Sequence, residues 1–210
     1  MPAPSWGEPR PGLLTRVLGR ARQLLGPVAS PERVGLRELP VALRRGELAE
    51  AYLSAERERD DRRAATSAVA AMDRAIEARD WWPADIWAHR ALWHFERAGL
   101  ELQAARQARR IGDLRSAAGD PASARRYYAE AIDESRDIGA EHEQGLAAVG
   151  LGRALLELGQ VTEARRLASA GVDLLERAAA PAGQIEAARE LLGHEVAVGE
   201  STESTEEGEG

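Results

Sequence analysis

The stretch LGRALLELGQVTEA, residues 151–164, decides the fold, because its spacing of small residues recurs in the chain. Five positions have earlier counterparts at one 40-residue offset, and the pairs are Gly112 and Gly152, Gly119 and Gly159, Ala124 and Ala164, Tyr128 and Ala168, and Ala131 and Gly171. Gly or Ala at a crossing point lets two antiparallel helices approach closely, and a Gly at a turn adopts a backbone conformation that other residues reach at a cost. The repeat therefore predicts helical hairpins.

This pattern resembles the tetratricopeptide repeat, most closely over residues 100–178. The family has a small residue midway along the first helix of each hairpin, a Gly at the turn and small residues along the second helix. The resemblance implies an all-α fold, a right-handed superhelical stack of antiparallel helical hairpins. The 40-residue period exceeds the family's usual period of about 34, so longer helices or a longer exit are expected, supplied by residues 132–145 and 172–184.

Fainter copies precede the clear ones. Ala84, Ala88 and Ala91 keep the 40-residue offset, and Gly46, Ala51 and Ala55 are assigned to a still earlier copy at a 33-residue offset. The predicted helices lie near residues 12–26, 31–45, 47–59, 62–79, 84–98, 101–118, 121–138, 141–158, 161–178 and 182–197. Pro40 is expected to kink or break the second helix. The last helix is expected to cover the final repeat, because stacked repeats need a cap at each end.

The predicted organisation has four parts. Residues 1–11 form a flexible Pro-rich leader, 12–26 a basic amphipathic helix, 31–198 the repeat domain with its C-terminal capping helix, and 199–210 a disordered acidic tail. The apolar arc of the amphipathic helix comprises Leu13, Leu14, Val17, Leu18, Ala21, Leu24 and Leu25. Its other arc carries Arg16, Arg20 and Arg22.

Charge and composition exclude several classes of protein. Residues 1–45 hold eight Arg against three Glu, so their net charge is +5 and the rest carries −12 of the chain's total of −7. Such an acidic body argues against nucleic-acid binding, which needs a clustered basic face. No apolar run is long enough to span a membrane. The chain has no Cys, which rules out disulfides and zinc-thiolate sites, and the cytoplasm is the expected compartment.

Enzymatic signatures are missing from the sequence. None of the four His residues lies three or four positions from another, there is no HExxH motif, and without Lys no phosphate-binding GxxxxGK(S/T) loop can occur. Gly150-Leu151-Gly152 lacks the third Gly and the preceding strand of a dinucleotide-binding loop. We expect a non-enzymatic protein with no cofactor and no metal.

The candidate partner-binding site follows from the resemblance, because the family binds peptides in a groove lined by its first helices. The groove residues that it implies are Arg106, Arg109, Arg110, Asp113, Val149, Arg153 and Leu156. Planar guanidinium groups in a groove suit carboxylates, so the expected partner is an acidic or extended peptide. The alternative is a solvated face whose arginines pair with Glu101 or Asp113.

Four of the five Trp residues fall between positions 81 and 93. Trp87 is expected in the core. A possible contact patch, of the kind in which binding energy concentrates, comprises Trp81, Trp82, Ile86 and Trp93. For Trp93, burial under the Arg-rich leader is the alternative.

These features predict an adaptor, scaffold or regulatory subunit that binds a partner protein through the groove. A second hypothesis is a targeting or assembly subunit that docks to a larger structure or a membrane surface through residues 12–26. The same segment could instead fold back as a cap. Self-association through unpaired repeat ends is a third hypothesis.

Overall fold

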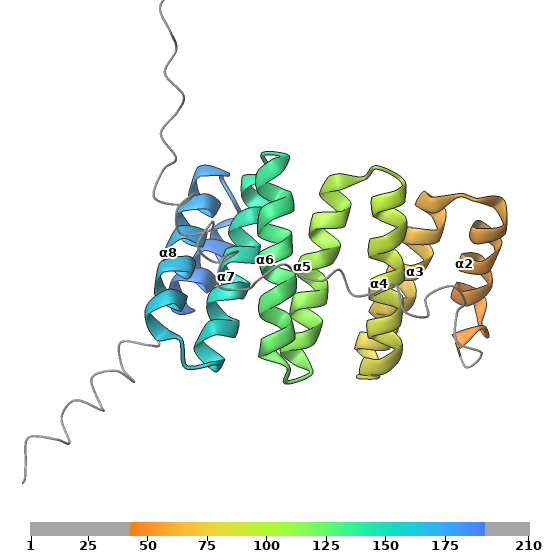
Figure 1. Cartoon of the computed structure of the whole chain (residues 1–210), viewed down its shortest axis with the longest axis horizontal. Helices are drawn as coiled ribbons and strands as arrows, with labels where there is room; N and C mark the ends of the chain where they lie inside the picture. The colour runs from red at the N-terminus through yellow and green to blue at the C-terminus, as the bar shows by residue number, and fades with distance from the viewer. Residues whose placement is uncertain (1–42, 192–210) are drawn as a thin grey trace, which may run out of the picture.

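The computed structural model describes residues 43–191, and these residues form a single row of helices (Figure 1). The helices are α2 (Glu47–Glu58), α3 (Asp61–Glu77), α4 (Trp81–Arg97), α5 (Glu101–Ala117), α6 (Pro121–Asp137), α7 (Glu141–Glu157) and α8 (Val161–Arg177). Residues 182–191 are also helical. No strand occurs between residues 43 and 191, so the predicted all-α fold is confirmed.

Consecutive helices pack against each other along the whole row. Three hairpins, α3–α4, α5–α6 and α7–α8, are joined by contacts of α2 with α3, α4 with α5 and α6 with α7. The first helices α5 and α7 also touch directly. We call α3, α5 and α7 the first helices and α2, α4, α6 and α8 the second helices. The predicted leader, amphipathic helix and acidic tail, with Pro40, lie outside the described residues.

The turns recur at a 20-residue interval. Each one has a residue with positive φ, and these residues are Arg59, Arg79, Gly99, Gly119, Gly139, Gly159 and Ala179. In each turn the next amide donates to the carbonyl five residues back, as Asp120 does to Arg115 at 2.9 Å. This hydrogen bond satisfies a carbonyl at the helix end, and the left-handed residue reverses the chain. From α3 to α8 every helix has 17 residues, so the extra length of the 40-residue repeat lies in its helices and not in a longer exit.

Two sequence-based assignments at the N-terminal end of the described chain were wrong. The faintest copy was given a 33-residue offset, but Arg59 and Gly99 end α2 and α4 with the same left-handed turn, so the offset between these helices is 40 and Ala51 corresponds to Ala91. Residues 43–45, the described end of the helix predicted over 31–45, are not α-helical. The first described helix, α2, begins after Gly46, whose φ is 98°.

The helix predicted to begin at residue 84 starts three residues earlier, at Trp81. Pro83 therefore lies within the first turn of α4. Proline is tolerated within the first helical turn, because the amide hydrogen that it lacks would have no intrahelical partner there. The remaining helix boundaries agree with prediction to within two residues where the described chain contains them.

Tyr128 is among the largest fully buried side chains of the described residues, and two glycines leave the space that it fills. It is 1% exposed. A Cβ atom on Gly112 of α5 would lie 2.7 Å from its ring, and one on Gly150 of α7 would lie closer still. Both distances are shorter than carbon atoms tolerate, so the ring of this second-helix residue fits only because two first helices lack side chains there.

The next hairpin uses glycine on both of its helices. A Cβ on Gly171 of α8 would lie 2.9 Å from the carbonyl oxygen of Gly145 on α7, and a Cβ on Gly145 would lie 3.0 Å from the carbonyl oxygen of Gly171. Gly152 meets Ala164 and Ala168 at the other end of the same hairpin, where its Cβ would be 3.1 Å from each. Backbone therefore approaches backbone at the crossings that the repeat pattern singled out.

The fit of Tyr128 predicts that one substitution, Gly150→Ala, has opposite effects on stability with and without the tyrosine ring. In the natural sequence, Gly150→Ala should destabilise the protein by about 1–3 kcal/mol, the usual effect of overpacking. In a Tyr128→Ala background the clash is gone, and the same substitution should stabilise by about 0.5–1 kcal/mol through its helix propensity. Urea denaturation of the four proteins in this double-mutant cycle measures both effects.

Gly183→Ala is the matched control, because nothing lies within 4 Å of a Cβ added at that helical position. It should be neutral or stabilising in both backgrounds. Equal effects of Gly150→Ala with and without the tyrosine ring would contradict this account of the crossing.

Candidate functional site

Three of the four predicted groove arginines lie on α5, where carboxylates of both neighbouring first helices meet them. Arg109 forms a hydrogen-bonded ion pair with Glu143 of α7, and Arg106 approaches the same carboxylate at 3.4 Å. Arg110 forms an ion pair with Asp73 of α3. We call these residues the charge ladder. It ties α3, α5 and α7 together across two hairpin boundaries.

Glu143 is the most deeply buried member of the ladder. Its side chain is 4% exposed, whereas that of Arg109 is 21% exposed. Burial by itself lowers the pKa of Arg109, but the charges of Glu143 and Asp113 outweigh burial and hold that pKa above its usual value. A buried carboxylate is costly without a cation, so Glu143 depends on Arg109.

Asp113 links the ladder to the hairpin core. Its carboxylate accepts hydrogen bonds from Arg109 Nη1 at 2.6 Å and from the Tyr128 hydroxyl at 2.8 Å. Burial and the neighbouring Asp113 charge raise the pKa of Tyr128 above its usual range. The tyrosine that fills the glycine pocket thus anchors an acidic side chain at the surface.

The arginines of α5 differ in how freely they can meet a partner. Arg106 has a side chain that is 53% exposed, whereas Arg110 is 32% exposed. Arg109 and Arg110 are occupied by carboxylates of this chain. The sequence-based alternative of internal pairing is confirmed for Arg109, which pairs with Asp113. The pairs with Glu143 and Asp73 were not foreseen, because residues so distant in sequence gave no local signal.

The α7 positions of the predicted groove do not form one surface. Val149 is buried, and it packs with Gly171 of α8, so its assignment to the groove was wrong. Leu156 is half-buried against the core, and Arg153 is exposed. The physical reason is that α7 is enclosed by α8 on one side and α6 on the other, which leaves few of its residues at the surface.

The predicted aromatic patch reduces to one residue. Trp82 is 56% exposed, but Trp81 and Ile86 are partly buried against the core. Trp93 is half-buried, and the guanidinium carbon of Arg97 stacks 4.4 Å from the centre of its ring. Trp87 is 5% exposed, which confirms its place in the core. The first turn of α4 brings Trp81 inward because the helix begins earlier than predicted.

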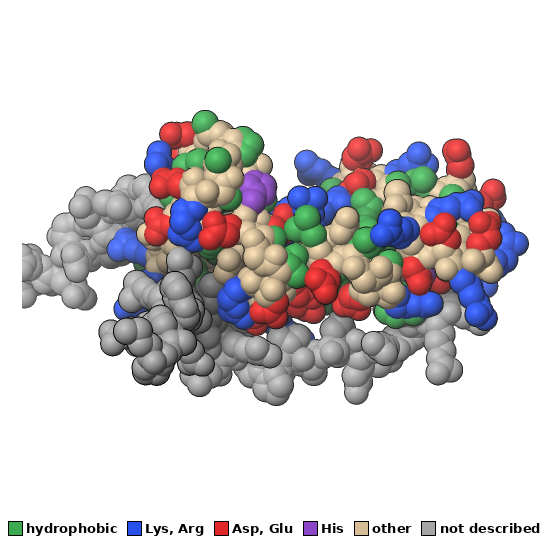
Figure 2. All heavy atoms as spheres, turned by 90° about the horizontal axis from the view of Figure 1, so that it is seen from above, with side chains coloured by type: hydrophobic (Ala, Val, Ile, Leu, Met, Phe, Trp, Pro, Cys, Tyr) green, Lys and Arg blue, Asp and Glu red, His purple; other side chains and the backbone are tan. Residues whose placement is uncertain are grey.

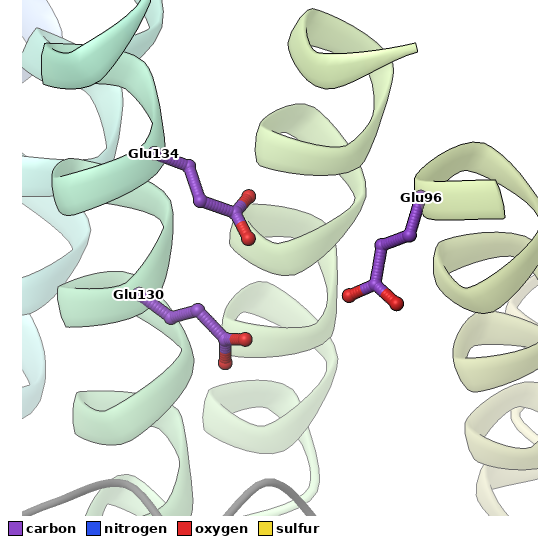
Figure 3. A group of neighbouring side chains, drawn as sticks. All are labelled: Glu96, Glu130 and Glu134. Carbon is purple, nitrogen blue, oxygen red and sulfur yellow. The ribbon is translucent and has the colours of Figure 1, made fainter. Parts of the chain in front are cut away.

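A group of three glutamates, which we call the Glu cluster, was not foreseen. Glu130 and Glu134 of α6 point towards Glu96 near the end of α4 (Figure 3). One carboxylate oxygen from each lies within 4.8 Å of the others. Oxygens suit hard cations, but Ca²⁺ takes about six to eight of them, so three carboxylates alone do not define a metal site. The spacing of Glu130 and Glu134 was a like-charge signal in the sequence, whereas Glu96 gave none.

The Glu cluster concentrates negative charge where water is partly excluded. Burial, followed by the charges of Glu130 and Glu96, raises the pKa of Glu134 to about 7. Burial and the Glu96 charge also raise the pKa of Glu130. A cavity of about 310 Å³, lined by Glu96, Glu134 and apolar residues including Leu100 and Ile138, opens beside the cluster.

A buried polar network holds α2 against the next hairpin. The Tyr52 hydroxyl donates to Glu56 at 2.7 Å, accepts from Arg90 at 2.9 Å and lies 3.0 Å from His94 Nε2. The other ring nitrogen of His94 lies 2.7 Å from Asp61 of α3. Arg90 and His94 are 1% and 2% exposed, so the network is internal and joins α2, α3 and α4.

Over the face seen in Figure 2, acidic and basic side chains interleave and do not collect into patches of one sign. Within residues 43–191, no helix combines the length and the apolar character that crossing a membrane requires. A comparison with models of known protein families finds no match, and neither does a comparison with curated proteins. The resemblance to the tetratricopeptide repeat therefore stays a prediction.

The charge ladder predicts a large effect from one buried carboxylate. Glu143→Ala should destabilise the protein by about 1.5–3 kcal/mol, because it leaves the partly buried Arg109 with only the exposed Asp113 as its counter-charge. Glu141→Ala is the control on the same helix, since its pair with Arg177 is half-exposed on both sides and contributes little. Urea denaturation measures both variants, and similar small effects would show that the ladder does not bind the hairpins together.

The raised pKa of Glu134 predicts a pH-dependent gain from neutralising it. The ionised carboxylate is disfavoured in the folded state, so its contribution to stability falls as pH rises from the unfolded pKa through about 7. Glu134→Gln should therefore raise the melting temperature at pH 8 and change it little at pH 4.5. Glu157→Gln, at an exposed position of α7, is the control and should show no such dependence. A gain that is the same at both pH values would contradict the assignment.

Proposed function

We propose that this chain is a non-enzymatic protein-interaction module that binds a segment of a partner protein along the face formed by its first helices. The observation that carries the proposal is that some arginines of the first helices are paired within the chain while others are exposed. Arg109 and Arg110 are held by internal carboxylates, while Arg106 is half-exposed and Arg153 is exposed on the neighbouring first helix. A rigid charged frame thus presents two guanidinium groups outward.

An acidic, extended peptide fits this face best. Guanidinium groups bind carboxylates through paired, charge-assisted hydrogen bonds, and Arg keeps its charge at any pH that the protein meets. Arg106 lies 3.4 Å from Glu143, and because its side chain is half-exposed, a partner carboxylate can also reach the same guanidinium. The ladder fixes the spacing of the first helices, so little ordering is needed on binding.

The tetratricopeptide-like family assignment and a cytoplasmic location belong to the same proposal. The first rests on the 40-residue hairpin with glycines at its crossings and turns. The second rests on a sequence without cysteine, which needs no oxidising compartment. A catalytic role finds no support in the sequence motifs, and both ring nitrogens of the buried His94 have partners within the chain.

Selection from a random displayed peptide library tests the proposal with a defined probe. Acidic peptides should be enriched on the full chain, and fluorescence anisotropy with one enriched peptide should give an affinity that falls with salt. Arg106→Glu and Arg153→Glu should each weaken that binding about tenfold, which corresponds to about 1.4 kcal/mol.

Arg166→Glu is the matched control, because Arg166 is an exposed arginine on the second helix α8. Its binding should stay within about twofold of the unsubstituted chain, once non-specific attraction is allowed for. Enrichment of peptides without acidic residues, or equal losses from Arg106→Glu and Arg166→Glu, would rule out the first-helix face as the binding site.

A further inference from the structure

Among the described residues, α2 is a second helix without a first helix. Its closing turn at Arg59 matches the turns at Gly99, Gly139 and Ala179, which end the second helices α4, α6 and α8. Each of those three packs on the first helix that precedes it in its own hairpin. Residues 43–46 precede α2 in the described chain and do not form an α-helix.

The face of α2 that should meet a first helix is incompletely covered. In α6 and α8 this face is marked by Tyr128, which meets Gly112, and by Ala168, which meets Gly152. Both are nearly fully buried, at 1% and 2% exposure, whereas the corresponding residue of α2, Leu48, is only half-buried. One turn later the same comparison holds, because Ala91 and Ala131 are fully buried and Ala51 is half-buried.

An apolar groove opens beside this face and marks where the rest of the chain leaves. It has a volume of about 250 Å³, and the apolar residues around it include Leu43, Leu48, Ala71, Ala75 and Trp87. Leu43 is the first residue that the structure describes. The preceding part of the chain therefore joins the stack at its open end.

We propose that residues 12–26 of this chain pack on α2 through Leu48 and Ala51 and complete the first hairpin. Their apolar arc of Leu13, Leu14, Val17, Leu18, Ala21, Leu24 and Leu25 is the largest in the preceding segment. As a helix this segment would be about 22 Å long, against about 18 Å for α2. The connection from residue 27 to residue 42 spans up to about 53 Å, which is ample for the return.

Charged residues of both signs line the groove, Arg45 and Arg74 as well as Glu47 and Asp80, and the acids of α2 lie beside the half-covered stripe. Glu47 and Glu50 are exposed on α2, next to Leu48 and Ala51. Arg16 and Arg20, four positions apart on the polar arc of the segment, would face outward beside them. Burial of leucines on the half-covered stripe supplies the affinity, and the charges favour this segment over an acidic one. The proposal does not depend on the peptide-binding face.

Disulfide trapping tests the contact in the full chain, which has no native Cys to interfere. Ala51→Cys is combined in turn with cysteine at Leu14, Leu18, Ala21 or Leu25 on the apolar arc, and with cysteine at Arg16 or Arg20 as controls. A disulfide forms only where two Cα atoms come within about 4.4–6.8 Å. At least one apolar-arc pair should form an intramolecular disulfide in the monomer under mild oxidation, and the polar-arc pairs should not.

Three outcomes would overturn the proposal. They are no disulfide from any apolar-arc pair, equal yields from both arcs, and disulfide-linked dimers, which would show that a second copy covers α2. Leu18→Asp gives an independent measurement on the chain without introduced cysteines. It should lower the melting temperature by several degrees, whereas Arg22→Asp on the polar arc should lower it less, and equal shifts would contradict docking.

Discussion

The close approach of first and second helices is the constraint on which the stack depends. At the centre of the row, Tyr128 fills a space that Gly112 and Gly150 leave empty, and its hydroxyl reaches Asp113 beyond them. One side chain on α6 therefore meets two other helices and fixes how two hairpins meet. Contacts of this kind are short-range, so each helix is positioned by its immediate neighbours along the row.

Charges stabilise the stack where glycine-mediated packing ends. The first helices carry acids and arginines that pair between hairpins, with Glu143 buried beside Arg109. The second helices show the opposite arrangement at the Glu cluster, where three acids converge and burial raises the pKa of Glu134. Opposite charges therefore attract on the face of the first helices, whereas like charges repel one another between α4 and α6.

The repeat pattern predicted the helices, their order and most of their boundaries, because glycine and alanine are required wherever helices touch. It could not predict which charges pair. Arg110 and Asp73 are 37 residues apart in sequence, and only the stacked hairpins bring them together. Val149 was misplaced because α7, the helix that holds it, is enclosed on more than one side. The repeat pattern assumes that each first helix has one buried face and one exposed face, so it does not reveal this.

The identical closing turns have a consequence for how such a chain can change length. A left-handed residue at regular intervals makes one helix and its turn a fixed modular length. Gain or loss of one complete hairpin by unequal recombination would keep every later helix in its original role. Gain or loss of a single helix with its turn would put every later first helix in the place of a second helix and the reverse. Bulky side chains would then meet one another at the crossings. Length variation in this architecture should therefore occur in whole hairpins.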